Sequence, residues 1–270
     1  MTRGRRDGYT RRVPLDKYDL YTICVQDPPR LARFLQAVHG GGARILREDF
    51  SGPAAICRAW VELGLGDTAI AVDRDPAPLR KVRGAKGLRI VQRDVMKAPH
   101  RADIIAALNF PLGYWHERRD LVRYLDASRR RLRPGGVLVA DLYGGVTAFE
   151  KGVTRRRFRG PSGERITYEW EQLATDALTC RVHNQIHFTV ATSRGSTDRS
   201  RKLRRAFDYD WRLWSIPELS DAMFDAGFRS VDVYSRLGDA IDSDGRMYVS
   251  PVAPGEGLDP TWVVYVAARV

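Results

Sequence analysis

The fold of this protein is decided by the stretch ILREDFSGPA at positions 45–54. Two apolar residues and three charged ones lead into a turn of small residues around Gly52, and a helical pattern follows over 54–63. The region 43–46 predicts a first strand, and further short apolar runs, separated by helical patterns, follow it at 68–72, 88–92, 103–108 and 137–142. Such an alternation of strands and helices is typical of a doubly wound α/β domain with a mostly parallel sheet.

A second pattern follows Gly145. Apolar and polar residues alternate around Trp170, across 180–190 and around Tyr209, which predicts antiparallel strands with one buried face. Helical and strand patterns typical of the α/β domain return at Ser215. We therefore expect an antiparallel β lid inserted into the α/β domain, and the chain divides into a helical arm (1–42), a cofactor-binding core (43–146), the lid (147–213) and the rest of the core (214–270).

Composition limits the class of protein. Of the 270 residues 43% are hydrophobic and 29% are charged, which excludes a disordered or fibrous chain. No apolar run approaches the roughly 20 residues that span a bilayer, and the basic segment Met1–Arg12 has no apolar stretch of a secretory signal. Three scattered cysteines argue against a disulfide framework. These features predict a cytoplasmic protein without a membrane partner.

The net charge of +12 has two interpretations. Only six of the 45 basic residues are lysines, and clusters of arginine lie at 3–6, 129–131, 155–157 and 199–205. They are compatible with a surface that follows nucleic-acid phosphates, or with a general preference for arginine on solvated surfaces. Because the clusters lie in unrelated parts of the chain and carry no nucleic-acid motif, we favour the second interpretation.

The residues at the predicted strand ends suit a nucleoside ligand. Ligands of open α/β sheets bind beyond the carboxyl ends of the strands. Gly52 opens a helix N-terminus to a ligand, and Asp73, 21 residues later, follows the second strand at a spacing suited to ribose hydroxyls. Asp94, beside Val95, is placed to accept from an exocyclic amine, and Asn109 ends the fourth strand.

In this order, the motifs resemble those of the class I S-adenosylmethionine-dependent methyltransferases. The family pattern acid-x-G-x-G-x-G maps to Glu48–Ala54, the ribose acid to Asp73 and the adenine-side acid to Asp94, while LRPGG at 132–136 resembles the turn before its fifth strand. The resemblance implies a seven-stranded sheet and S-adenosyl-L-methionine as cofactor. It also implies the cofactor-binding residues Arg47, Glu48, Phe50, Gly52, Asp73, Arg74, Asp94, Val95 and Asn109.

Methyl transfer requires an aligned nucleophile and the exclusion of water, because a sulfonium methyl group is already electrophilic. The predicted function is transfer of that methyl group to a small-molecule acceptor by in-line displacement. The catalytic candidates are Asn109, Tyr18, Tyr21 and His116, with Phe110, Tyr114 and Trp115 as further aromatic candidates and His183 and His187 as further bases. A metal site built from His183 and His187 is not expected. Residues four apart on one strand lie about 13 Å from each other, too far to bind the same ion.

Two alternatives stay open. A nucleic-acid methyltransferase is favoured by the net charge and by the segment NFPL at 109–112. This segment is a distant match to the motif N-P-P-Y, which binds the amino group of a flipped base. A non-catalytic S-adenosylmethionine-binding protein would keep the fold without transferring the methyl group. A nicotinamide dehydrogenase is disfavoured because G-x-G-x-x-G is absent after the first strand.

Overall fold

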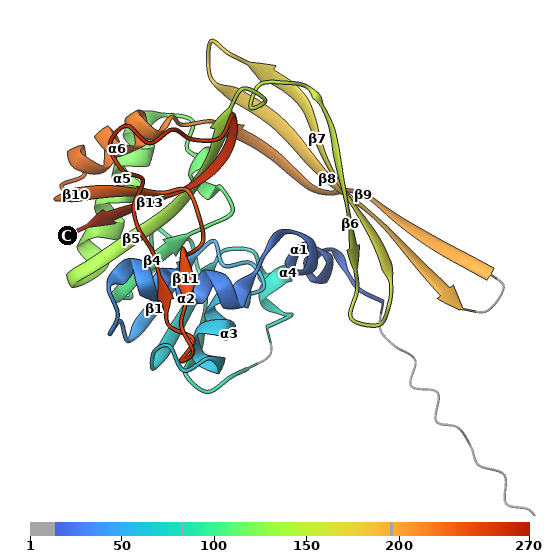
Figure 1. Cartoon of the computed structure of the whole chain (residues 1–270), viewed down its shortest axis with the longest axis horizontal. Coiled ribbons are helices and arrows are strands. Elements are labelled where there is room, and N and C mark those ends of the chain that lie inside the picture. Colours follow the sequence, from blue (N-terminus) through green and yellow to red (C-terminus); the bar gives the residue numbers. More distant parts are fainter. Residues whose placement is uncertain (1–13, 83, 195–196) are drawn as a thin grey trace, which may run out of the picture.

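The structure is a computed structural model that describes residues 14–82, 84–194 and 197–270. The basic segment that begins the chain, with Arg3, Arg5 and Arg6, therefore lies outside the described residues. Figure 1 shows two parts, an α/β layer structure that contains the C-terminus and a curved antiparallel sheet that extends away from it. In the described part of the chain, no helix is long and apolar enough to cross a membrane.

The α/β part is built on one seven-stranded sheet with the order β10-β13-β5-β4-β1-β2-β3. Strands β1 to β5 are parallel, and β13 is antiparallel to both of its neighbours. This arrangement confirms the predicted fold class. The strands are β1 (Ile45–Asp49), β2 (Thr68–Asp73), β3 (Leu88–Gln92), β4 (Ala102–Ala107), β5 (Leu132–Gly145), β10 (Ser230–Tyr234) and β13 (Thr261–Arg269).

Helices cover both faces of this sheet and form two hydrophobic cores. Helices α2 (Pro28–His39) and α3 (Ala55–Glu62) pack on one face, and α5 (Arg118–Arg131) and α6 (Ile216–Asp225) pack on the other. Short elements, α4 (Pro76–Leu79) and the 3₁₀ turn η1 (Pro111–Tyr114), follow β2 and β4. Helix α6 begins with a capping box, in which Ser215 and Glu218 cap each other's backbone.

The inserted segment forms the predicted antiparallel sheet. Its strands β6 (Gly152–Arg159), β7 (Arg165–Asp176), β8 (Arg181–Arg194) and β9 (Thr197–Arg212) pair in sequence order. Helix α1 (Lys17–Val25) packs on its apolar face through Leu20 and Cys24. The two helices of the expected N-terminal arm therefore separate, α1 joining this sheet and α2 the core. A small hairpin of β11 (Ala240–Ile241) and β12 (Met247–Tyr248) precedes β13.

The first strand differs from its prediction. It runs over Ile45–Asp49 rather than 43–46, and its three charged residues Arg47, Glu48 and Asp49 are all buried. Sequence patterns assign such a charged run to a strand end, because burying an ion without a partner is unfavourable. Here Arg47 and Asp49 pair with each other, Glu48 accepts from the backbone of Cys57, and distant segments supply the further partners of Arg47 and Asp49, so the strand continues through the charged run.

Candidate active site

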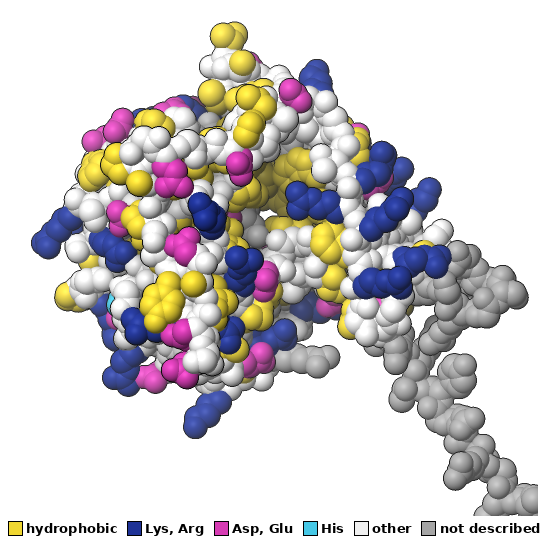
Figure 2. Space-filling model, viewed as in Figure 1, with side chains coloured by type: hydrophobic (Ala, Val, Ile, Leu, Met, Phe, Trp, Pro, Cys, Tyr) yellow, Lys and Arg dark blue, Asp and Glu magenta, His cyan; other side chains and the backbone are white. Residues whose placement is uncertain are grey.

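A cleft of about 890 Å³ lies beyond the carboxyl ends of β1, β2, β3 and β4. Helix α1 and strand β9 form its opposite wall, and Figure 2 shows the hollow between the two parts, with hydrophobic side chains on its wall. Seven of the predicted cofactor-binding residues line this cleft. They are Phe50, Gly52, Asp73, Arg74, Asp94, Val95 and Asn109.

The turn after β1 has the backbone of a glycine-rich loop with only one glycine. Phe50, Gly52 and Ala54 have φ angles of 59°, 52° and 54°, in the left-handed region. Only glycine adopts this region without strain. The Phe50 ring is held against Trp115, with ring centroids 5.5 Å apart. Tertiary packing therefore supports at Phe50 the conformation that glycine adopts freely.

Asp73 connects the turn after β1 to the turn after β2. Its carboxylate accepts hydrogen bonds from the backbone N–H of Gly52 (2.8 Å) and of Asp75 (2.9 Å). Each carboxylate oxygen has two acceptor positions, so Asp73 retains acceptor capacity for ligand hydroxyls. The spacing of 21 residues predicted from the sequence thus brings the two turns into direct contact.

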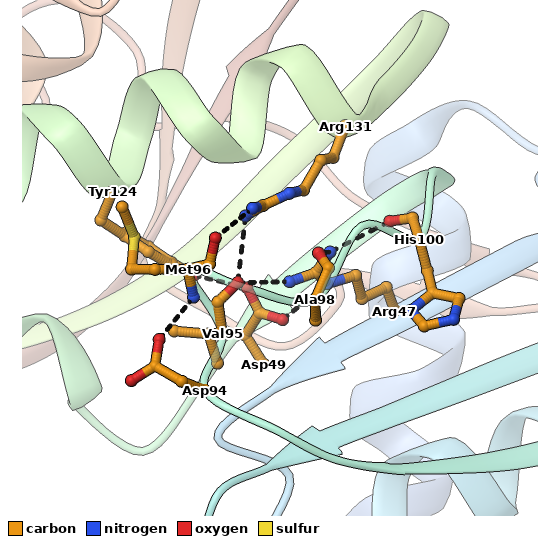
Figure 3. A network of polar contacts seen from close by, with 9 residues as sticks. All are labelled: Arg47, Asp49, Asp94, Val95, Met96, Ala98, His100, Tyr124 and Arg131. Carbon is orange, nitrogen blue, oxygen red and sulfur yellow. Dashed lines mark hydrogen bonds and ion pairs between the residues drawn. The ribbon is translucent and has the colours of Figure 1, made fainter.

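Arg47 does not line the cleft. Its side chain is fully buried and lies 2.7 Å from Asp49, measured from Nε to Oδ1. Its two terminal nitrogens donate to three backbone carbonyl oxygens, those of Val95, Ala98 and His100 (Figure 3). These contacts correct the prediction that Arg47 binds the cofactor: Arg47 instead supports the loop that follows Asp94.

A second arginine reaches the same loop from α5. Arg131 donates to the carbonyl oxygens of Val95 and Met96, and the Asp94 carboxylate accepts from the backbone N–H of Met96 at 2.8 Å (Figure 3). Tyr124, also on α5, donates its hydroxyl to Asp49 at 3.1 Å. The loop that carries the predicted adenine-side residues is therefore anchored from both β1 and α5.

Glu48 also lies beneath the cleft rather than in it. Its side chain is buried, and Oε2 accepts from the backbone N–H of Cys57 at 3.1 Å. Burial raises the pKa of Glu48 to about 7, although the hydrogen bonds from Cys57 act to lower it. The prediction of direct cofactor contact is corrected here too, and Glu48 instead holds the start of α3 against the turn.

Asn109 and Phe110 turn the chain sharply after β4. Both have left-handed backbones, with φ of 72° and 65°, and their N–H groups donate to the two oxygens of Asp141 at 2.8 and 2.7 Å. Strained residues of this kind persist only where their surroundings hold them, and they cluster at functional sites. Burial raises the pKa of Asp141 to about 7, against the lowering effect of the two N–H donors.

The far side of the cleft is an aromatic wall of five side chains. Tyr18 and Tyr21 come from α1, Tyr114 from η1, and Phe207 and Tyr209 from β9. Phe207 is the centre of the contacts, with its ring centroid 5.0 Å from that of Tyr21 and 5.9 Å from that of Tyr18. Sequence reasoning missed Phe207 and Tyr209 as site residues, although their period-two alternation was the signal that they share a buried face.

The histidines lie outside the cleft. His116 contacts the backbone of β9, with Nε2 3.0 Å from the carbonyl oxygen of Asp210, and it does not line the site. His183 and His187 pair with Asp208 (2.6 Å) and Glu171 (2.8 Å) on the face of the sheet opposite the aromatic wall. These positions remove all three from the candidate bases. No metal-binding group of three or more His, Cys, Asp or Glu is found among the described residues.

The cleft residues fit an S-adenosyl group. A Cβ added at Gly52 would meet no atom within 4 Å, so the backbone there is open to a ligand. Ser51 is buried and lines the cleft, and its hydroxyl has no hydrogen-bond partner in the described part of the chain. An orphaned polar group of this kind needs an explanation, and a polar ligand supplies one.

Comparisons with known proteins agree with this geometry. No protein-family profile and no curated protein matches the chain. Among solved structures, the chain is similar to the sugar N-methyltransferase KedS8 from Streptoalloteichus sp., with 17% identity, 100% of this chain and 98% of that chain covered, and a TM-score of 0.65. It is also similar to DesVI of Streptomyces venezuelae (16% identity, 96% and 100% covered, TM-score 0.68).

A third similar structure is CalS10, described as an amino pentose methyltransferase from Micromonospora echinaspora. The identity is 16%, 96% of this chain and 99% of that chain are covered, and the TM-score is 0.66. Each comparison spans both parts of the chain. The fold of this protein is therefore that of the class I S-adenosylmethionine-dependent methyltransferases. The similarity to these three structures also extends over the antiparallel sheet.

Proposed function

We propose that this protein is an S-adenosylmethionine-dependent methyltransferase that acts on a small-molecule acceptor. The observation that carries the proposal is one continuous cleft, in which Gly52, Asp73 and Asp94 from three strand ends face the aromatic wall formed by α1, η1 and β9. The similar solved structures include a sugar N-methyltransferase and an amino pentose methyltransferase, which supports a small acceptor. The cleft volume also falls in the range of small-ligand sites.

Each part of the cleft has a place in this function. Asp73 would accept hydrogen bonds from the ribose hydroxyls, Asp94 and Val95 would contact the adenine, and the Phe50–Ala54 turn, with Arg74 nearby, would hold the methionine part. When bound, the cofactor supplies an electrophilic methyl group. Asn109, held rigidly by Asp141 between the two halves, would orient the acceptor. Alignment and exclusion of water are the main requirements for such a transfer.

Calorimetric titration with S-adenosylmethionine and S-adenosylhomocysteine tests the proposal. We expect both to bind, and Asp73→Ala to weaken binding by about 1–3 kcal/mol, because a paired acceptor of the ribose hydroxyls is lost. Asp221→Ala, which removes an exposed aspartate of α6 outside the cleft, is the matched control and should bind as the wild type does. Absence of binding by the wild-type protein would refute the proposed function.

A further inference from the structure

Strand β9 is interrupted by a bulge opposite His187 of β8. On one side of the bulge, Ile186 pairs with Phe207. On the other side, Phe188 pairs with Leu203, so that one residue of β8 lies opposite three residues of β9, where a regular ladder has one. Bulges are common next to functional sites, where they change the direction and position of the side chains that follow.

The bulge decides which side chains of β9 line the cleft. Continuation of the regular pairing would place Arg205 opposite Ile186, on the apolar face of the sheet. Phe207 and Tyr209 would then be displaced by two residues along the strand, which is about 7 Å. With the bulge in place, Arg205 is exposed, and Phe207 and Tyr209 line the cleft.

The backbone at the bulge is strained and takes its hydrogen-bond partner from outside the ladder. Arg205 has a φ angle of 48°, in the left-handed region that is unfavourable for residues other than glycine. Its backbone N–H donates to Nδ1 of His187 at 2.9 Å. A backbone N–H away from water needs an acceptor. The imidazole of His187 therefore takes the place of the carbonyl oxygen that a regular ladder would supply.

The His187 ring is fixed by a second contact. Because Nδ1 accepts a hydrogen bond, the proton of the neutral ring lies on Nε2, which is 2.8 Å from Oε2 of Glu171 on β7. Only 5% of the His187 side chain is exposed, although it lies on the face of the sheet opposite the aromatic wall. Both ring nitrogens are thus engaged, and the ring cannot turn without losing both contacts.

We propose that His187 is a positioning residue for the aromatic wall and acts through the bulge of β9. By holding the N–H of Arg205, it keeps Phe207 and Tyr209 in the wall. Tyr209 is in turn stacked on Trp211, with ring centroids 4.2 Å apart. His187 itself does not line the cleft. The proposal rests on the methyltransferase function above in one respect, that the wall encloses the cleft in which this reaction takes place.

Two amide variants of His187 test the proposal. In His187→Asn the side-chain oxygen lies where Nδ1 lies in histidine, so the acceptor for Arg205 is kept and the contact with Glu171 is lost. In His187→Gln the amide lies at the position of Nε2, so the contact with Glu171 is kept and the acceptor is lost. The matched control is His183→Gln. His183 lies on the same face of β8 and contacts Asp208, at a place where the pairing with β9 is regular.

Near-ultraviolet circular dichroism measures the packing of Tyr209 on Trp211, at a temperature where the far-ultraviolet spectrum shows every variant to be folded. Tyr209→Leu defines the part of the signal that comes from this stack. We expect His187→Gln to lose more than half of that part, and His187→Asn and His183→Gln to keep most of it. A residue that only added stability would lower the melting temperature without changing the spectrum of the folded protein.

Two outcomes of this measurement would refute the proposal. Either His187→Gln keeps the wild-type spectrum, or His187→Asn loses as much of it as His187→Gln does. In both cases the contact with Nδ1 does not hold the bulge.

Calorimetric titration with S-adenosylhomocysteine supplies a second test. His187→Gln should bind it as the wild type does, because Gly52, Asp73 and Asp94 lie on the other wall of the cleft. A loss of affinity in this variant would show that the substitution disturbs the whole cleft, and the role assigned to His187 would be wrong. Failure of the wild-type protein to bind S-adenosylhomocysteine would instead count against the proposed function and leave the role of His187 in β9 unchanged.

Discussion

Replacement of Arg47 by methionine is the most informative perturbation of the network beneath the cleft. Met fills much of the volume of the arginine stem but leaves Asp49 without its ion partner and the carbonyl oxygens of Ala98 and His100 without a donor, while that of Val95 keeps only Arg131. Because both side chains of the pair are fully buried, breaking it costs about 3–5 kcal/mol. Domains of ordinary stability have about 5–15 kcal/mol, so we expect Arg47→Met to fold with a strongly reduced free energy of unfolding.

Urea denaturation followed by circular dichroism measures this loss, and calorimetry measures the second effect. The loop after Asp94 loses its anchor on β1, so S-adenosylmethionine should bind several-fold more weakly to Arg47→Met even where the protein is fully folded. A double variant, Arg47→Met with Asp49→Leu, removes the unpaired charge. It should recover part of the stability but not the affinity, since the loop carbonyls still lack their donor.

Arg58→Met is the control for the loss of one arginine. Arg58 lies on α3 with a partly exposed side chain and pairs with Glu62 at 3.6 Å. Exposed pairs of this kind contribute at most about 1 kcal/mol, so the control should unfold and bind almost as the wild type does. An Arg47→Met protein that loses less than about 1 kcal/mol and keeps its affinity would refute the role assigned to the network.

Three further predictions address the rest of the site. Gly52→Ala should reduce the free energy of unfolding by about 1–2 kcal/mol, because alanine is strained in the left-handed backbone of Gly52. It should also reduce cofactor affinity, because the new methyl group enters open cleft space. Thermal melts with and without S-adenosylhomocysteine separate the two effects. Asn109→Ala should lower turnover with cofactor affinity nearly intact, and equal turnover would remove Asn109 from the site. Burial raises the pKa of both Glu48 and Asp141 to about 7, so the folded state binds protons that the unfolded state has released above about pH 4. The free energy of unfolding should therefore fall as the pH rises from about 4 to about 7, and Glu48→Gln should flatten that slope in denaturation curves at pH 5.5 and 8.

Most of the residues that line the strand-end side of the cleft were predictable from the sequence. Phe50, Gly52, Asp73, Asp94 and Asn109 all lie at predicted strand ends, and the carboxyl ends of parallel strands meet at one edge of a sheet. Knowledge of the strand pattern was thus sufficient to bring them together. The exceptions, Arg47 and Glu48, precede the strand end and are turned into the core.

Arg47 shows why the rest was not predictable. From sequence alone, a charged residue in an apolar strand is interpreted as a ligand-binding or exposed side chain, because burial of an unpaired ion is unfavourable. Its actual partners lie 48 to 53 positions further along the chain, apart from Asp49. No local pattern encodes contacts over such distances, and only the folded chain shows that each guanidinium nitrogen of Arg47 has an acceptor.

The sequence by itself determined the alternation of strands and helices, the inserted antiparallel strands and the residues at the strand ends, because these features depend on periodicity within short segments. Only the tertiary structure decided which side of the antiparallel sheet faces the cleft. It placed Tyr21 of α1 against Phe207 of β9 and turned His183 and His187 away. The physical reason is that the alternation of side chains with a period of two assigns residues to the two faces of a strand. It does not determine which segment of the chain covers either face.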